Sequence, residues 1–243
     1  MTTAFDYLSI AKMIDHALLQ PFLCTDELDA GCKLALGYDV ASVCILPYYV
    51  KRAAEILNGS SVGTSTTIGF PHGGHTTSTK LAEVQQALED GAIELDIVVN
   101  ISKAKSNDWN YVRDEIEMLT KRIHSEGAKV KIIFENAYHD DKAKIELCRI
   151  CGEASVDWVK TSTGYAPTGA TLDDLRLMRK HSPAHVQVKA AGGVRDLNTI
   201  LAAREIGVTR VGCSRTAEIL EDCRKRLGLP PITTVSGTTA ASY

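Results

Sequence analysis

The chain has 243 residues and a formal net charge of −3, with acidic and basic residues interspersed along it. This balance excludes a basic surface for nucleic acid, or for an anionic membrane, as the main contact. No apolar run approaches the ~18 residues of a membrane helix, and the first residues lack the pattern of a secretory signal. The seven cysteines form an odd, scattered set, which favours reduced thiols. We therefore expect a cytoplasmic protein.

Short apolar runs typical of strands alternate with segments of helical periodicity along the chain. The first strand, around Ile14-Asp15 and Leu18-Leu19, is the weakest of the series. The later strands are predicted at residues 40–46, 62–69, 93–99, 130–135, 158–160, 186–189 and 208–212. The helices are predicted at residues 25–36, 50–57, 79–88, 109–124, 142–151, 172–180, 197–206 and 216–227. A short extra helix and turn is expected within residues 101–108.

About eight strand–helix alternations predict right-handed crossovers, a parallel sheet and closure into a (β/α)8 TIM barrel with a short N-terminal helix. An open doubly wound sheet is the alternative, but its dinucleotide-binding form carries Gly-x-Gly-x-x-Gly after an early strand, which this chain lacks. Such barrels use roughly 200 to 250 residues as one domain. We therefore expect a single barrel domain at residues 1–232. The small, polar residues 233–243 are expected to form a flexible C-terminal tail.

Charged side chains recur at or near the ends of the predicted strands, at Asp15, Asp96, Glu135, Lys160 and Lys189. In a TIM barrel these ends meet at the mouth that carries the active site. Charged residues in apolar strands are seldom buried without partners, so the five are expected to form one mutually compensated cluster. A set of purely structural ion pairs is the alternative interpretation.

The two lysines point to a specific chemistry. Each one ends an apolar run that leads into a glycine-bearing turn. Burial and a second nearby ammonium both lower the pKa of a lysine, and a partly neutral amine attacks carbonyl carbons to form a Schiff base. Strand periodicity places Asp96 on the inner face, where it could steady one ammonium and pass protons through water. The residues alone do not decide whether Lys160 or Lys189 reacts.

Three glycine-bearing turns follow the last three strands. Backbone N–H groups in such turns, with the first turn of the next helix, form anion sites, and TIM barrels often bind phosphate there. Each turn alone is weak evidence, because glycines after strands are commonly just turn formers. The phosphate-site residues predicted from the turns are Gly164, Gly192, Gly193, Val194, Arg195, Gly212, Ser214 and Arg215.

Neither metal binding nor a cofactor is predicted. Cys148 and Cys151 have the Cys-x-x-Cys spacing, but no second pair stands at zinc-site spacing, and the helical period around them predicts a buried helix face. His72 and His75 flank glycines in a loop without an identifiable third ligand. We expect turn or supporting roles for these histidines.

Taken together, the motifs resemble those of the deoxyribose-phosphate aldolase family, over nearly the whole length. The motifs that carry this resemblance are Ile14-Asp15-His16-Ala17-Leu18-Leu19, Gly69-Phe70-Pro71-His72-Gly73, Glu94-Leu95-Asp96-Ile97-Val98, Val159-Lys160-Thr161-Ser162-Thr163-Gly164 and Lys189-Ala190-Ala191-Gly192-Gly193-Val194-Arg195. The last two are the most specific. The family has a (β/α)8 barrel and a class I mechanism, in which a lysine Schiff base replaces any added cofactor.

The resemblance implies reversible cleavage of 2-deoxy-D-ribose 5-phosphate into acetaldehyde and D-glyceraldehyde 3-phosphate. By position, Lys160 resembles the Schiff-base lysine, Lys189 the neighbouring ammonium and Asp96 its partner in proton transfer through a water. Asp15 and Thr163 fall near the proton-relay and water positions. The glycine turns fall where the family holds the substrate phosphate, and homo-oligomers, dimers or larger, are common in it.

Two further positions come from the resemblance. Cys44 falls near the active site of relatives and is open to alkylation by enal by-products. Tyr243 ends a tail like that of some relatives, in which a terminal tyrosine enters the site and helps to move a proton; a tail without a role is the alternative.

The chain departs from the family pattern at Asn136, usually threonine, and at Arg215, often a small residue. Arg215 could tighten phosphate binding or turn toward Glu218. Two other functions stay open: a phosphate-binding isomerase that uses Asp96 and Glu135 as acid and base, and a sugar-phosphate binder without turnover.

Overall fold

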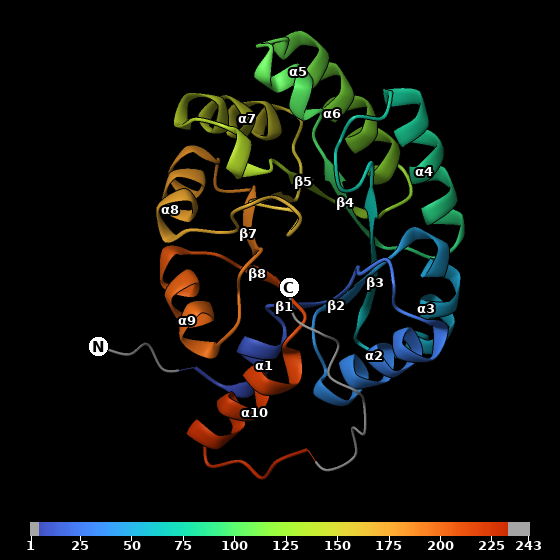
Figure 1. The fold of residues 1–243 in the computed structure, drawn as a ribbon, viewed down its shortest axis with the longest axis vertical. Helices are drawn as coiled ribbons and strands as arrows, with labels where there is room; N and C mark the ends of the chain where they lie inside the picture. The colour runs from blue at the N-terminus through green and yellow to red at the C-terminus, as the bar shows by residue number, and fades with distance from the viewer. Residues whose placement is uncertain (1–4, 233–243) are drawn as a thin grey trace.

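The computed structural model describes residues 5–232, and within them the strands close into one parallel barrel. Figure 1 looks into this barrel, with the helices in a ring around it. The strands are β1 Ile14–Leu18, β2 Ser42–Ile45, β3 Gly63–Ile68, β4 Glu94–Val98, β5 Lys129–Ile133, β6 Trp158–Lys160, β7 Gln187–Ala191 and β8 Arg210–Cys213. Each strand pairs with the next along the chain, and β8 pairs with β1. The predicted TIM barrel is confirmed, including its weak first strand.

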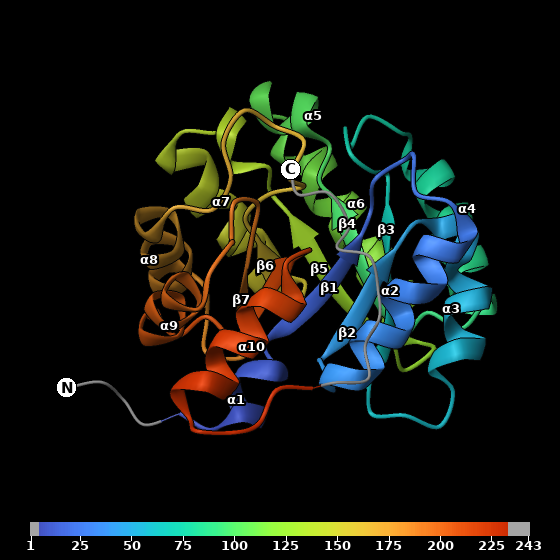
Figure 2. The ribbon, with the colours of Figure 1, turned by 60° about the horizontal axis from the view of Figure 1, so that its bottom comes forward.

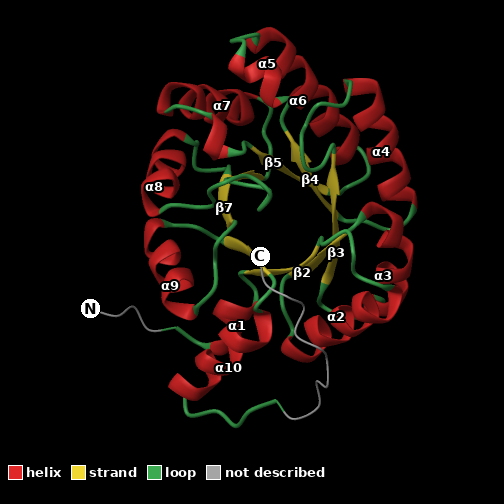
Figure 3. Cartoon of the chain, viewed as in Figure 1, coloured by secondary structure: helices red, strands yellow, loops and turns green. Residues whose placement is uncertain are grey.

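Helices follow the strands in the expected alternation, as the colours of Figure 3 show. The α-helices are α1 Tyr7–Ala11, α2 Thr25–Tyr38, α3 Val50–Leu57, α4 Thr77–Glu89, α5 Ile101–Lys105, α6 Trp109–His124, α7 Asp141–Glu153, α8 Leu172–His181, α9 Leu197–Ile206 and α10 Thr216–Arg226. The 3-10 helices are η1 Pro47–Tyr49 and η2 Asn136–Tyr138. The short N-terminal helix α1 packs beside α10 (Figure 2). The predicted extra helix is α5.

Polar residues fix where several helices begin. Asp140, Thr171 and Asp196 each accept a hydrogen bond from the backbone N–H three residues further along, at the start of α7, α8 and α9. Such caps satisfy N–H groups that have no partner inside the helix, and each contributes about 1 kcal/mol. The helices therefore start at defined distances from the strand ends, and the loops between them have fixed lengths.

The main hydrophobic core lies between the barrel and its ring of helices. On β4, Leu95 and Ile97 are buried in this core, while Glu94 and Asp96 take part in ion pairs with residues of other strands. This alternation follows from the two-residue period of a strand. The closed barrel thus separates an apolar outer layer from an interior that holds charged side chains.

Three other predictions concern the cysteines of α7, membrane helices and the C-terminal tail. Cys148 and Cys151 are buried on α7, as predicted for a helix face. Among residues 5–232 no helix has the length and apolarity needed to span a bilayer. The predicted flexible tail, with Tyr243, lies outside the described residues. The division of the chain into a barrel domain at 1–232 and a tail at 233–243 stays a prediction.

Candidate active site

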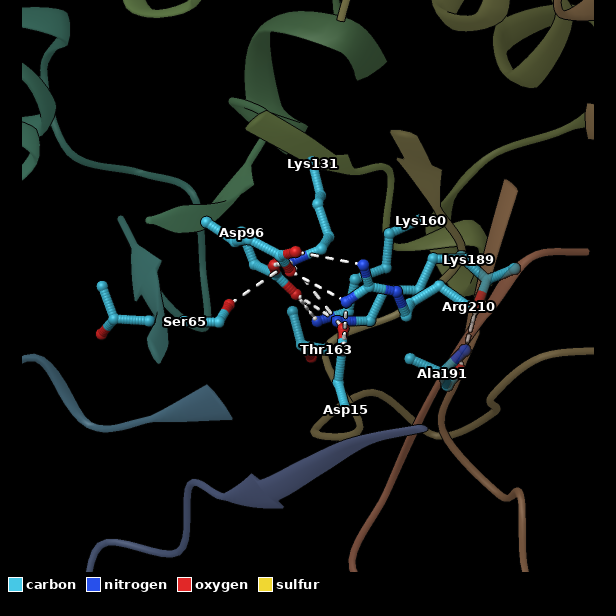
Figure 4. Close-up of polar contacts among 12 residues, drawn as sticks. Asp15, Ser65, Asp96, Lys131, Lys160, Thr163, Lys189, Ala191 and Arg210 are labelled. Atoms are coloured by element: carbon cyan, nitrogen blue, oxygen red, sulfur yellow. Dashed lines mark hydrogen bonds and ion pairs between the residues drawn. The ribbon is translucent and has the colours of Figure 1, made fainter. Parts of the chain in front are cut away.

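The centre of the site is Asp96, whose carboxylate contacts three lysines from three strands (Figure 4). Its Oδ2 lies 2.6 Å from Nζ of Lys160 and 2.7 Å from Nζ of Lys189. Its Oδ1 lies 2.8 Å from Nζ of Lys131. Lys160 and Lys189 are direct partners in the pairing of β6 with β7, and this register explains how both amines reach one oxygen.

A second carboxylate, Asp15 on β1, continues the network across the closure of the barrel. Its Oδ2 lies 2.5 Å from Nζ of Lys189, and its Oδ1 accepts a hydrogen bond from Arg210 on β8 at 2.6 Å. Glu94 contacts Arg210 through both oxygens at 3.0 Å and lies 2.6 Å from Nζ of Lys131. The described interior therefore combines three carboxylates with four basic groups.

This imbalance acts on the pKa of both aspartates at its centre. Burial opposes ionisation of Asp96, but Lys131, Lys160 and Lys189 hold the pKa of its carboxyl well below the ordinary range. Asp15 responds in the same way to Lys189, Arg210 and Lys131, which outweigh its burial and lower its pKa. Both carboxylates are therefore strongly committed to the charged form.

The two candidate lysines respond in opposite directions. Burial lowers the pKa of Lys160, and the Lys189 ammonium lowers it further, while Asp96 opposes both. Burial also penalises the charge of Lys189, but Asp15 and Asp96 together raise its pKa above the ordinary value. If one of the three lysines is neutral, the three carboxylates balance the charges of the three cations that remain. The group whose pKa is lowered is Lys160, so the structure separates two lysines that the sequence left equivalent.

One pocket at the mouth of the barrel collects most of the predicted residues. The predicted residues that line it are Asp15, Cys44, Lys160, Thr163, Gly164, Lys189, Gly192, Gly193, Val194, Arg195, Gly212, Ser214 and Arg215. Asp96 lies below them, fully buried, and reaches the pocket through Lys160 and Lys189. Tyr243 lies outside the described residues.

The turn after β7 packs closely against the loop after β6. Gly192 and Gly193 have φ values of 83° and 79°, which favour glycine. A Cβ on Gly192 would lie 2.9 Å from Cα of Gly169, and N of Ala170 donates to the Gly192 carbonyl at 3.0 Å. Only glycine fits this backbone contact, which holds the two loops against each other; Gly164 of the first loop and Gly192 and Gly193 of the second line the pocket.

Arg215 lines the pocket, but its guanidinium pairs with Glu218 at 3.0 Å. Of the two roles considered from the sequence, the structure has the turn toward Glu218. Asn136, the other departure, is buried and donates from Nδ2 to the sulfur of Met178 at 3.3 Å. This contact directs it toward α8, and it does not line the pocket.

The expectation of one five-member cluster is wrong for Glu135. Its carboxylate accepts hydrogen bonds from Thr163 rather than pairing with the lysines. The reason is local: Glu135 has φ 59° and ψ 65°, a left-handed conformation, where β5 passes into η2. This conformation turns the residue toward the loop after β6.

Lys131 and Arg210 were missed by the sequence analysis. Lys131 lies inside β5 with no glycine turn behind it, whereas Arg210 begins β8, two residues before Gly212. The signal that could have found Lys131 is its position between the apolar residues Val130 and Ile132, the same pattern that singled out Asp96. Cys44, which was predicted, is buried at the pocket, and burial raises the pKa of its thiol.

The described side chains form no cluster of the kind that binds a metal ion. Within residues 5–232 no group of three or more His, Cys, Asp or Glu residues is arranged to hold a metal ion. His75 pairs through Nδ1 with Glu83 at 2.9 Å, and His16 contacts the Thr216 hydroxyl at 2.8 Å. The first contact joins the loop after β3 to α4, and the second joins β1 to α10; the supporting roles expected for His72 and His75 stay predictions.

Comparison with known proteins gives consistent matches. The model of the DeoC/LacD family aldolase matches residues 10–211. A deoxyribose-phosphate aldolase from Rhodopirellula baltica is 58% identical over 98% of this chain and 99% of its own length. One from Caldanaerobacter subterraneus is 43% identical over 90% of this chain and 95% of its own. The tetrameric deoxyribose phosphate aldolase from Aeropyrum pernix superposes with a TM-score of 0.83 at 29% identity, covering 91% of this chain and 93% of that one.

Proposed function

We propose, from the premise that this chain belongs to the DeoC/LacD family of aldolases, that it cleaves 2-deoxy-D-ribose 5-phosphate reversibly into acetaldehyde and D-glyceraldehyde 3-phosphate. It is a class I aldolase, an aldehyde-lyase. Membership confirms the resemblance seen in the motifs. The observation that carries the proposal is one buried carboxylate shared by two lysines, of which Lys160 alone of the pair has a lowered pKa.

Lys160 is the nucleophile. Its neutral amine adds to the C1 aldehyde of the open-chain sugar, and loss of water gives the Schiff base. The C2–C3 bond then breaks, its electron pair moves toward the iminium nitrogen, and the C3 hydroxyl gives up its proton as it becomes the aldehyde of the three-carbon product. Protonation of the remaining enamine at C2 and hydrolysis release acetaldehyde and restore the amine.

Lys189, Asp96 and Asp15 support these proton transfers. The Lys189 ammonium lowers the pKa of Lys160, so that a fraction of the Lys160 amine is neutral. Asp96 holds both nitrogens at hydrogen-bonding distance. A water held among these groups would carry protons between the substrate and the network, with Thr163 as a further contact in the pocket. The low pKa of Asp96 makes it a poor general base on its own, which disfavours an isomerase that relies on Asp96 and Glu135.

The substrate phosphate binds the wall formed by the last loops. Positive φ values at Gly164, Gly192 and Gly193 leave room for close approach to the backbone, and Gly212 and Ser214 lie on the adjoining turn. The other residues of this wall are Val194, Arg195 and Arg215. Binding here places C1 of the sugar toward Lys160.

Two assignments depend on the family alone. Cys44 is a site of alkylation by enal by-products, although the raised pKa of its thiol makes the thiolate scarce. For Tyr243, which lies outside the described residues, the assignment is to help move a proton at the acetaldehyde methyl carbon. No cofactor takes part.

The oligomeric state and the cellular location of the protein are also proposals. We assign a homo-oligomer, supported by the tetrameric form named for the Aeropyrum pernix relative. We assign the cytoplasm, supported by cysteines that are all free thiols and by a phosphorylated substrate.

The decisive experiment is borohydride reduction in the presence of acetaldehyde, followed by mass mapping of the peptides. We expect a reduced two-carbon adduct on Lys160 and none on Lys131 or Lys189. An adduct on another lysine contradicts the assignment of the nucleophile. No adduct at all, with sugar phosphate bound or isomerised, would favour an isomerase or a silent binder instead.

A further inference from the structure

Arg210 and Glu94 form a buried ion pair that the mechanism above does not use. They are the first residues of β8 and β4, and neither lines the pocket at the mouth of the barrel. Nη1 and Nη2 of Arg210 each lie 3.0 Å from one oxygen of Glu94. Residues at the amino ends of barrel strands ordinarily serve stability rather than catalysis. The contacts of this pair, however, continue to the lysines of the site.

Arg210 joins the pair to the lysine network through Asp15. Its Nη1 donates to Asp15 Oδ1 at 2.6 Å, and Asp15 Oδ2 lies 2.5 Å from Nζ of Lys189 (Figure 4). The guanidinium carbon also lies 4.9 Å from the centroid of the Trp158 ring. A planar guanidinium suits this combination of two carboxylates and an aromatic ring better than an ammonium would. The charge of Arg210 is therefore held at a defined place next to Asp15.

Glu94 reaches the same network through a different lysine. Its Oε2 lies 2.6 Å from Nζ of Lys131, which in turn lies 2.8 Å from Asp96 Oδ1. Asp96 is the carboxylate that Lys160 contacts. Lys131 and Asp96 are both 0% exposed, so water screens the charges along this path only weakly. A change of charge at Glu94 should therefore be felt at Lys160.

The number of charges in the network determines how many of its amines can stay protonated. When fully ionised it carries one surplus positive charge, from the seven residues Asp15, Glu94, Asp96, Lys131, Lys160, Lys189 and Arg210. Burial opposes the charge of Arg210, but Asp15 and Glu94 outweigh it and raise its pKa. Of the four basic groups, Lys160 alone has a lowered pKa. The surplus is therefore relieved by loss of a proton from Lys160.

Two further titratable groups act on Lys160 from other strands. Burial raises the pKa of the Cys44 thiol on β2, which keeps it neutral. Burial also raises the pKa of Glu135, which follows β5 and accepts hydrogen bonds from Thr163. In the part of the chain that the structure describes, neither one forms a hydrogen bond or ion pair with Arg210 or Glu94. Both therefore affect Lys160 equally in every variant of that pair.

We propose that Arg210 is a positioning residue, which holds Asp15 beside Lys189 and supplies the surplus charge that leaves the Lys160 amine neutral, and that Glu94 limits this surplus. The inference rests on the proposed function and extends it to the end of the barrel opposite the mouth. Removing the cation leaves three carboxylates with three lysines, so that every amine can stay protonated. Removing the Glu94 carboxylate instead raises the surplus to two charges, and removing both groups restores a surplus of one.

The test is the pH dependence of kcat/KM for cleavage of 2-deoxy-D-ribose 5-phosphate. Its rising limb reports the pKa of the amine that must be neutral. Arg210→Met should raise the pKa of Lys160 and move the limb to higher pH, whereas Glu94→Gln should lower this pKa and move the limb to lower pH. A unit charge about 10 Å away, at an effective dielectric constant of about 20, shifts a pKa by about one unit, and we expect shifts of about this size. Arg210→Met/Glu94→Gln should return the limb close to its wild-type position.

Two controls separate charge from structure. Arg210→Lys keeps the cation but loses the planar contacts, so it should lower stability while leaving the limb near its wild-type position. Glu115→Gln removes a buried carboxylate that pairs with Lys80 in the helix layer, and it should not move the limb. Circular dichroism verifies the fold of each variant. If Arg210→Met does not fold, Glu94→Gln carries the same test with the opposite sign.

Opposite shifts that cancel in the double variant would support the proposal. Limbs that stay in place in the folded single variants, or that move in the same direction, would overturn it and leave the pair a purely structural role. Borohydride trapping of acetaldehyde on the wild-type protein keeps this result apart from the proposed function. An adduct on Lys160 with unmoved limbs contradicts only the role of Arg210 and Glu94, whereas an adduct on another lysine contradicts the assignment of the nucleophile itself.

Discussion

Two buried lysines in different layers of the molecule have lowered pKa values but different surroundings. Lys80, on α4, lies in the helix layer, where its Nζ pairs with Glu115 of α6 at 2.9 Å and donates to the Val98 carbonyl at 2.8 Å. Lys160 lies in the barrel and shares Asp96 with two other lysines. Burial is the largest cause of the lowered pKa in both.

The comparison shows that a lowered pKa does not by itself identify a nucleophile. Lys80 is 0% exposed, and within residues 5–232 it is the one cation that forms an ion pair with Glu115. Lys160 lines a pocket, and it competes for its carboxylate with neighbouring ammonium groups. Access for a carbonyl carbon and competition for the counter-charge are what distinguish the proposed nucleophile, Lys160, from Lys80.

The largest expected effect comes from removing the reactive amine. Lys160→Ala should reduce cleavage of 2-deoxy-D-ribose 5-phosphate by at least about 10³-fold, because in the proposed mechanism no other group forms the Schiff base. The measurement is coupled detection of glyceraldehyde 3-phosphate, with circular dichroism to verify the fold. Cleavage at a wild-type rate by the folded variant would remove Lys160 from its role.

For substitution of Lys80 we expect the opposite result, a loss of stability without a loss of activity. Lys80→Met leaves Glu115 charged and unpaired in the interior, which should lower the free energy of unfolding by about 3–5 kcal/mol. The folded protein should keep its kcat/KM. Urea unfolding measures the first effect and steady-state kinetics the second. The double variant Lys80→Met/Glu115→Leu is the control, and it should recover most of the lost stability if the unpaired charge is the cause.

Competition for Asp96 is tested at Lys189. In Lys189→Leu the positive field on Lys160 is gone, so the pKa of Lys160 should rise. A higher pKa means less neutral amine at neutral pH, so kcat/KM should fall about tenfold or more, and the rising limb of the pH–rate profile should move to higher pH. An unmoved limb would show that the two amines are not coupled.

The smallest effect is expected at Arg215. Its guanidinium already pairs with Glu218 near the surface, and exposed pairs of this kind contribute little. Arg215→Ala should raise KM for the sugar phosphate by no more than about threefold, with kcat unchanged. A tenfold or larger rise would mean that Arg215 leaves Glu218 to bind the phosphate.

The barrel could be predicted from the sequence because its signals are local. Apolar runs such as residues 130–135 indicate strands, and helical periods such as residues 109–124 indicate helices, without reference to the rest of the chain. The alternating order of these elements is compatible with few fold topologies. The boundaries were less accurate: the helix expected at residues 79–88 begins at Thr77, because Thr76 caps it.

Several residues of the site could be predicted from the sequence, but the ion pairs between them could not. Asp96 and Lys160 are marked by charge inside apolar strands, yet which amine has the lower pKa depends on which carboxylates face it across strands far apart in the chain. Lys131 supplies charge to the cluster from the interior of β5, where no turn marks it, and Arg210 supplies charge from the first residue of β8. Glu135 departed from expectation because its backbone conformation, rather than its residue type, sets its direction.

The pairing of β8 with β1 has a consequence for synthesis on the ribosome. Asp15 is among the first residues made, while its partners Lys189 and Arg210 are made near the end. Until those partners emerge, a nascent chain holds this carboxylate without its two nearest counter-charges and has no complete pocket. Activity can therefore begin only after nearly the whole chain has been translated, and a fragment that stops before β8 should be inert.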